Sequence, residues 1–197
     1  MISYSGLQLK ISITGAIDIS GFKNIFCNVD EKLIGSVISV ELGNHLDGGE
    51  KVPAIVKAML TAAAGIGHMT GAFAAMWLPA KTISGFEYFA RVVADYDAGG
   101  AFPVLALVNF KKEDDGSIRS KGLDWLAGQE LLVAPSSDLS DSELMRRIVR
   151  VAHDLAVGGA IAQDMELAGI EEHERIELAP HQTELTLQMR TTTLSVQ

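Results

Sequence analysis

One segment, residues 101–128, constrains the fold of this chain more than any other part of it. It begins with an apolar run from Phe102 to Phe110, continues through charged residues to Gly116, and ends in a short apolar module at 122–128. The run over 104–110 predicts a central strand that is buried on both faces. The segment Asp114–Gly116 predicts the turn that follows, since glycine supplies the positive φ that tight turns often need.

Three long helices are predicted by apolar spacing and by their start signals. Pro53 suits a first helical turn, and apolar residues follow at helical spacing up to Gly67, where we expect that helix to end. Ser84–Glu87 and Ser140–Glu143 each have the form of a capping box, in which the serine and glutamate side chains bond free amides at a helix start. The second and third helices are expected to end at glycine pairs, Gly99–Gly100 and Gly158–Gly159.

Further segments have the alternating or continuous apolar pattern of strands: 7–13, 37–42, 73–78, 131–133, 174–178 and 183–189. The order of these segments predicts an α+β fold, a single mixed, partly antiparallel β-sheet with three main helices packed on it. The 197 residues are expected to form one domain. Within that domain, residues 1–35 give a less defined N-terminal strand region and residues 191–197 a frayed tail.

Charge and hydropathy limit the partners and the compartment. The formal net charge is −9 at pH 7, so nucleic acid is not an expected partner, because a phosphate backbone requires clustered Lys and Arg. The start lacks the pattern of a signal peptide, and the longest apolar stretch, 52–78, is interrupted by Lys57 and several glycines. We therefore expect a cytoplasmic protein without a membrane partner. Cys27 is the only cysteine and is expected to be a buried structural thiol.

Several segments together carry a family resemblance. They are Met76–Trp77 with the helix start at 84–89, the run 102–109 with the acidic turn 113–116 and Gly122–Leu123, the glycine-and-acid loop 158–169, and the closing segment 174–180. Over roughly residues 36–181 this pattern resembles a bacterial family designated domain of unknown function 4261. The resemblance implies an α+β fold and no established activity. A looser similarity to bacterial domains like suppressor-of-fused implies protein binding and, in some cases, toxin immunity.

The loop at 158–169 departs from the pattern of that family. Met165, Glu166 and Leu167 stand where the pattern has glycine, aspartate and threonine. If the loop holds a ligand in other members, the resemblance implies that this chain lacks the residues for it.

Asp164 and Glu166 are two carboxylates at a spacing that would place both on one side of a strand. Two close carboxylates can hold a hard cation or separate their pKa values for acid–base chemistry. The alternative is a charged strand edge that discourages pairing with another strand. An enzyme assembled from distant residues would use these carboxylates together with His153 as catalytic groups, in a hydrolase-like or metal-dependent reaction.

The five histidines of the chain do not form a pair at helical ligand spacing. The local cluster Glu171–Glu174, which contains His173, is expected to be a solvated loop, because neighbours on an extended chain face opposite sides. We therefore expect no metal and no cofactor.

Two tryptophans and three arginines are candidates for binding. Trp77 and Trp125 would line a pocket or an interface, or pack in the core. Arg146, Arg147 and Arg150 lie off the apolar stripe of the third helix, where they would bind an acidic partner or pair with the surplus acids of the chain.

Three functions remain open from the sequence. The first is a non-enzymatic protein-interaction protein of the immunity or accessory type, whose acidic surface favours a basic partner. The second is the enzyme described above. The third is a self-associating component, a homodimer formed through the alternating C-terminal strand at Glu184–Met189.

Overall fold

A computed structural model describes residues 1–25, 29, 35–136, 138–172, 174–181 and 184–191, the last four of them by backbone alone. The described chain divides into two compact units, residues 1–109 and 110–197, and each is described by itself. The predictions for Cys27, for His173 and for residues 192–197 of the tail lie outside the described residues, while Thr191, the first residue of the predicted tail, belongs to a strand.

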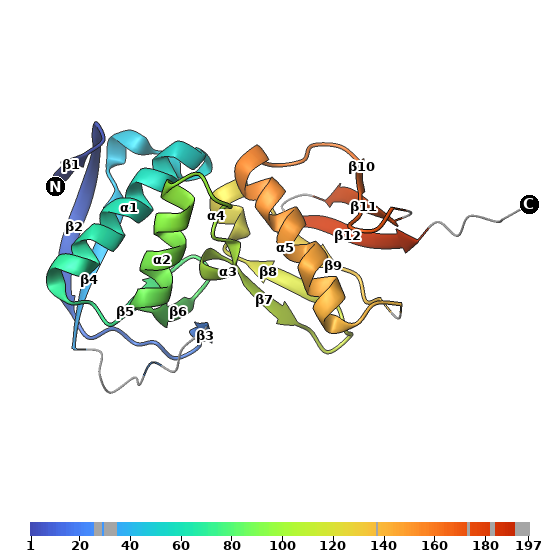
Figure 1. Ribbon diagram of the computed structural model, residues 1–197, viewed down its shortest axis with the longest axis horizontal. Coiled ribbons are helices and arrows are strands. Elements are labelled where there is room, and N and C mark those ends of the chain that lie inside the picture. The colour runs from blue at the N-terminus through green and yellow to red at the C-terminus, as the bar shows by residue number, and fades with distance from the viewer. Residues whose placement is uncertain (26–28, 30–34, 137, 173, 182–183, 192–197) are drawn as a thin grey trace, which may run out of the picture. The chain divides into compact units, whose positions relative to one another are not determined.

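The first unit contains two three-stranded sheets (Figure 1). In one, β2 (Leu7–Gly15) pairs antiparallel with both β1 (Ile2–Tyr4) and β4 (Ser36–Leu42). In the other, β6 (Thr82–Gly85) lies between β3 (Lys23–Ile25), which is parallel to it, and β5 (Ala74–Trp77), which is antiparallel. A small apolar cluster centred on Ile19 and Ile83 also takes in Val37 of β4 and Met76 of β5, so residues from both sheets contribute to it.

Helix α1 (Pro53–Thr70) packs against α2 (Phe86–Asp97) and against the sheet that contains β2 and β4. Two short 3-10 turns, η2 (Asn44–Leu46) and η3 (Gly49–Lys51), lead into α1. Pro53 begins α1 as expected, but the helix continues past Gly67 to Thr70. Its C-cap is Gly71, whose φ of 65° is in the left-handed region. Gly67 is instead a buried packing position, because a Cβ there would overlap the ring of Phe86.

The second unit is built on a six-stranded sheet with the order β10-β11-β12-β9-β8-β7. Its strands are β7 (Asn109–Lys112), β8 (Ile118–Lys121), β9 (Glu130–Val133), β10 (Met165–Ala168), β11 (Glu174–His181) and β12 (Glu184–Thr191). β12 runs parallel to β9 and antiparallel to β11. Side chains on one face of these strands are buried: Ile118, Leu131, Val133, Ile176, Leu178, Leu185 and Leu187.

Helix α5 (Asp141–Gly158) supplies the apolar stripe that the sequence predicts, with Leu144, Ile148 and Val151 buried. Its start is the expected capping box: the amide of Glu143 donates to Ser140 Oγ, and the amide of Ser140 donates to the Glu143 carboxylate. The short helix α4 (Leu123–Ala127) packs against α5. The predicted start, end and buried stripe of α5 are therefore confirmed.

The prediction of a single sheet is wrong, because the described strands form three separate sheets of three, three and six strands. The expected central strand over 104–110 is one cause of the error. Residues Val104–Leu107 form the short helix α3, and the strand β7 begins only at Asn109. The α+β class itself is confirmed. Three long helices, α1, α2 and α5, are present as expected, while the single-domain organisation stays a prediction.

The first capping box is also wrong. Ser84 is buried in β6 opposite Ala75, and α2 begins at Phe86 with Gly85 at its N-cap and no side-chain cap. Within the described ranges, none of the helices is both long and apolar enough to cross a membrane.

Candidate functional site

Strand β10 is the last strand at one side of the six-stranded sheet. It pairs antiparallel with β11, with Met165 opposite Leu178, Leu167 opposite Ile176 and Ala168 opposite Arg175. In the part of the chain that the structure describes, no strand pairs with its other side. An edge of this kind presents unpaired amide and carbonyl groups to whatever lies beside it.

The register identifies which backbone groups face outward. The amide of Gly169 donates to the carbonyl of Glu174 at 2.9 Å, so these two residues form a hydrogen-bonded pair of the antiparallel ladder. Because bonded pairs alternate along such a ladder, Leu167 and Met165 also direct their backbone groups toward β11. Glu166 and Ala168 therefore direct their amides and carbonyls away from the sheet, toward its open edge.

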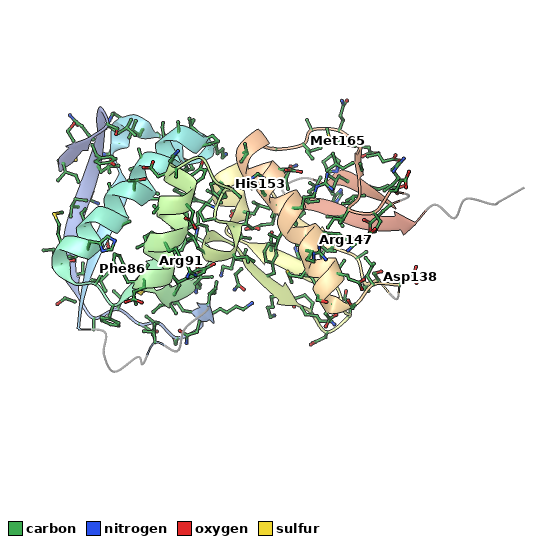
Figure 2. The ribbon with its side chains drawn as sticks, viewed as in Figure 1. Phe86, Arg91, Asp138, Arg147, His153 and Met165 are labelled. Atoms are coloured by element: carbon green, nitrogen blue, oxygen red, sulfur yellow. The ribbon has the colours of Figure 1, made fainter. Side chains whose placement is uncertain are left out.

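The turn between β10 and β11 is fixed by the carboxylate of Glu174. Its Oε2 accepts from the amides of Ile170 at 2.7 Å and Glu171 at 3.3 Å, and its Oε1 accepts from Arg147 Nε of α5 at 2.5 Å. The side chains of Arg147 and Glu174 are each 5% exposed, and Arg147 extends from α5 toward β11 (Figure 2). Arg147 also donates to the carbonyl of Glu143 at 2.9 Å. One buried carboxylate thus joins the helix to the edge hairpin.

Opposing effects act on the pKa of Glu174. Burial alone raises it, but the hydrogen bond from Arg147 and the two turn amides stabilise the ionised form more strongly and hold the pKa below its ordinary value. Arg150 adds a second link between helix and turn, because its guanidinium donates to the carbonyl of Gly169 at 2.8 Å. The Gly169 position has no room for a side chain, since a Cβ there would overlap Glu174.

Exposed acids flank β10. Asp164 directly precedes the strand, Glu166 lies within it, and Glu171 and Glu172 follow in the turn. The side chain of Glu166 remains 59% exposed although it lies 3.3 Å from Arg175 Nε. Met165 is 42% exposed, so the edge also carries an apolar side chain in contact with solvent.

A second carboxylate with several hydrogen bonds is that of Glu130, at the start of β9. Its Oε1 accepts from the amide of Gly122 at 2.6 Å, and its Oε2 accepts from Leu123 at 3.3 Å and from the Ser120 hydroxyl. Burial raises the pKa of Glu130, and hydrogen bonding and repulsion by Asp124 raise it further, against the opposing bonds from Ser120 and Gly122. A carboxyl with a raised pKa is suited to general-acid chemistry. Here, however, both oxygens are used to hold the start of α4.

The predicted catalytic residues do not form one cluster of contacts. Asp164 lies just before β10 and Glu166 within it, and Glu166 contacts Arg175. His153 lies on α5, with its Nδ1 3.3 Å from Asp154 Oδ1 (labelled in Figure 2). Among the described residues, no group of three or more His, Cys, Asp or Glu side chains is arranged to hold a metal ion. Glu166 lies on the edge strand β10, where a charged side chain disfavours pairing with a strand of like charge. Both interpretations of Asp164 and Glu166 stay predictions.

The candidate binding residues separate into different environments. Trp77 lies half-buried on β5 of the first unit, and Trp125 lies half-buried on α4 of the second. Arg146 and Arg150 are exposed on α5 as expected, but Arg147 is buried, so its expected placement off the buried side of the helix is wrong. Arg147 lies next to the apolar stripe and is buried because Glu174 of β11 pairs with it. The spacing of residues in the sequence did not identify that partner.

Strand β12 lies inside its sheet, between β11 and β9, and its residues Glu184–Leu187 pair on both sides. A homodimer stays a prediction, but the part Glu184–Leu187 of the predicted segment Glu184–Met189 does not offer a free edge for it.

The segment 158–169, which was expected to be a loop, contains the strand β10 at Met165–Ala168, and its first part is held in a way that the sequence did not indicate. The side-chain amide of Gln129, which is 6% exposed, donates to the carbonyl of Ile161 at 2.9 Å, and its oxygen accepts from the amide of Ile161 at 2.8 Å. This reciprocal pair fixes the segment that leads into β10 and completes the support of the edge strand.

Comparisons with protein-family models, with curated proteins and with solved structures found no match for this chain. The resemblance to the bacterial family of unknown function stays a prediction.

Proposed function

We propose that this protein is a non-enzymatic interaction module of the accessory or immunity type, which binds an extended strand of a partner protein along β10. The observation that carries the proposal is the outward direction of the backbone groups of Glu166 and Ala168 at the end of the sheet. Edge strands of this kind bind extended segments through main-chain hydrogen bonds, and neighbouring side chains select among them. The accessory or immunity role follows from the sequence resemblance.

The support of β10 favours binding. Glu174 and Arg150 fix the turn at one end of the strand, and Gln129 fixes the segment before its other end. An edge that is already ordered loses little conformational freedom when a partner strand is added, so more of the contact energy appears as affinity.

The opposite end of the sheet is less suited to strand addition. β7 carries Lys111 and Lys112 at exposed positions, and these pair with Glu113 and Asp141 at 3.0 Å. Lysines on an edge strand discourage addition of another strand. β10 carries one charged residue, Glu166, which lies 3.3 Å from Arg175, and combines it with the exposed apolar side chain of Met165 and with outward main-chain groups.

Replacement of Ala168 tests the proposal. Ala168→Pro removes the outward amide of β10, while the bonded pairs to β11 at Leu167 and Gly169 remain. Ala168→Val is the matched control, because it keeps the amide and suits a strand. We expect affinity purification from the source cells to recover one stoichiometric partner with the unmodified chain and with Ala168→Val, and to lose it with Ala168→Pro.

Hydrogen exchange locates the contact. In the complex, the amides of Glu166 and Ala168 should become protected, because they donate to the added strand. A partner that Ala168→Pro retains at full yield, or that leaves these two amides unprotected, contradicts the proposal. Recovery of no partner across conditions also counts against it.

A further inference from the structure

We infer that the strand bound at β10 alternates basic and apolar residues, and that it comes from a different protein and not from a second copy of this chain. This inference rests on the proposed function and adds the chemistry of the partner. Its basis is the charge around the edge and the alternation of side chains along β10.

The charge around β10 is negative. Asp164, Glu166, Glu171 and Glu172 are exposed at the strand or within four residues of its ends. Among the described side chains, the cations in contact with this region are Arg150, bonded to Gly169, and Arg175, close to Glu166. Four carboxylates against two guanidinium groups leave an excess of negative charge, in a chain whose formal net charge is −9. Such a field attracts a basic segment and repels an acidic one.

The two faces of β10 differ in chemistry. Met165 and Leu167 lie opposite Leu178 and Ile176, so they share the face on which those two side chains are buried. Glu166 lies on the other face, opposite Glu177. Successive side chains of an added strand also point to opposite faces. Its apolar residues would therefore cover Met165 and Leu167, while the residues between them would lie beside Glu166.

A second copy of the chain fits this edge poorly. If two β10 strands paired antiparallel with Glu166 opposite Glu166, two carboxylates would face each other directly. If Glu166 lay opposite Ala168 of the other chain, Asp164 would lie opposite Ile170 of that chain, which directly precedes its exposed acids Glu171 and Glu172. Like charges in such positions are destabilising, so the charged edge disfavours self-pairing and admits a basic strand.

Capped six-residue peptides with valine at alternate positions provide the test. The intervening residues are lysine, threonine or glutamate in three otherwise identical probes, and binding to the full chain is measured by fluorescence anisotropy. We expect the lysine peptide to bind about tenfold more tightly than the threonine peptide at low salt, and the glutamate peptide to bind most weakly. The preference should shrink as salt screens the exposed charges.

Charge-changed variants identify the groups responsible. Asp164→Lys combined with Glu166→Lys should reverse the order of the lysine and glutamate peptides. Asp114→Lys, at the exposed turn between β7 and β8, makes the same kind of charge change at the other end of the sheet and should leave the order unchanged.

Each remaining outcome overturns a defined statement. Equal binding of the lysine and threonine peptides, lost in Ala168→Pro, would overturn the inference about charge while supporting strand addition at β10. Binding that Ala168→Pro leaves unchanged would overturn the proposed function together with the inference. If the full chain forms a dimer that Ala168→Pro dissociates, a second copy occupies the edge and the inference of a different protein is wrong. If none of the three peptides binds, the inference of a basic partner strand is wrong.

Discussion

Arg147 Nε lies 2.5 Å from Glu174 Oε1, and both side chains are 5% exposed, so α5 and the edge hairpin share a buried ion pair. Removing one partner leaves a buried charge without its counterion, which typically costs about 3–5 kcal/mol. We expect Arg147→Ala to lower the free energy of unfolding, measured by urea denaturation, by an amount in this range. Arg146→Ala is the matched control, since Arg146 is exposed on the same helix and its loss should change stability by less than about 0.5 kcal/mol. Equal losses of unfolding free energy in Arg147→Ala and Arg146→Ala would contradict a stabilising role of the buried ion pair.

The same pair predicts how stability depends on pH. Burial opposes ionisation of Glu174, but the bonds from Arg147 and the turn amides lower the pKa of its carboxyl in the folded state. A lowered folded pKa stabilises the fold above the unfolded value, and this stabilisation is lost as the pH falls through the folded value. Glu174→Gln should therefore reduce the unfolding free energy at pH 7, and its difference from the unmodified protein should shrink on acidification.

Urea titrations between pH 7 and pH 3 check this expectation. Glu172→Gln changes an exposed acid in the same turn, and its stability should follow that of the unmodified protein across the range. A difference for Glu174→Gln that stays constant with pH would show that the ionised carboxylate is not the stabilising form.

Glu130 is expected to respond to its neighbour Asp124. Burial is the larger cause of the raised pKa of Glu130, and Asp124 adds to it. Asp124→Asn removes the negative charge and keeps an oxygen that can accept from the amide of Trp125, as Asp124 does at 2.8 Å. The pKa of Glu130 should therefore fall in this variant, because both the hydrogen bond and the repulsion from the Asp124 carboxylate are removed. Carbon-detected NMR titration of the Glu130 carboxyl measures the change, and an unaltered or higher pKa would contradict it.

The local signals of the sequence predicted individual elements better than their arrangement. Ser140–Glu143 forms its capping box, and the apolar stripe of α5 is buried, because both patterns depend on neighbours within one helix. Ser84–Glu87 has the same spacing, yet Ser84 belongs to β6, where pairing with β5 takes precedence over helix capping. A motif of four residues does not show which of two hydrogen-bonding schemes has the lower free energy.

Strand pairing was the main feature that the sequence could not provide. Periodicity identifies a strand and its buried face, but it does not identify the neighbour, so three sheets could not be distinguished from one. For the candidate site, Asp164 and Glu166 were recognised as a charged segment. The edge position of β10 and the bond from Arg147 to Glu174 depend on pairings between residues distant in the chain.

Gly67 and Phe86 give a sharp test of packing in the first unit. A Cβ at Gly67 would overlap the Phe86 ring, whereas a Cβ at Gly65, two residues earlier on α1, would meet no atom within 4 Å. Gly67→Ala should therefore destabilise the protein by about 1–3 kcal/mol through overpacking. Gly65→Ala should stabilise it by about 0.5–1 kcal/mol, because alanine favours the helix and Gly65 is exposed.

Phe86→Leu separates this steric effect from any intrinsic effect of alanine on α1. The smaller side chain should itself be destabilising, but it removes the ring that the new methyl group would strike. We therefore expect Gly67→Ala to cost less in the Phe86→Leu background than in the unmodified protein, as measured by a double-mutant cycle of unfolding free energies. If the losses of unfolding free energy in Gly67→Ala and Phe86→Leu were strictly additive, the Phe86 ring would not contribute to the cost of Gly67→Ala. The overlap would then be relieved by a shift of the α1 backbone.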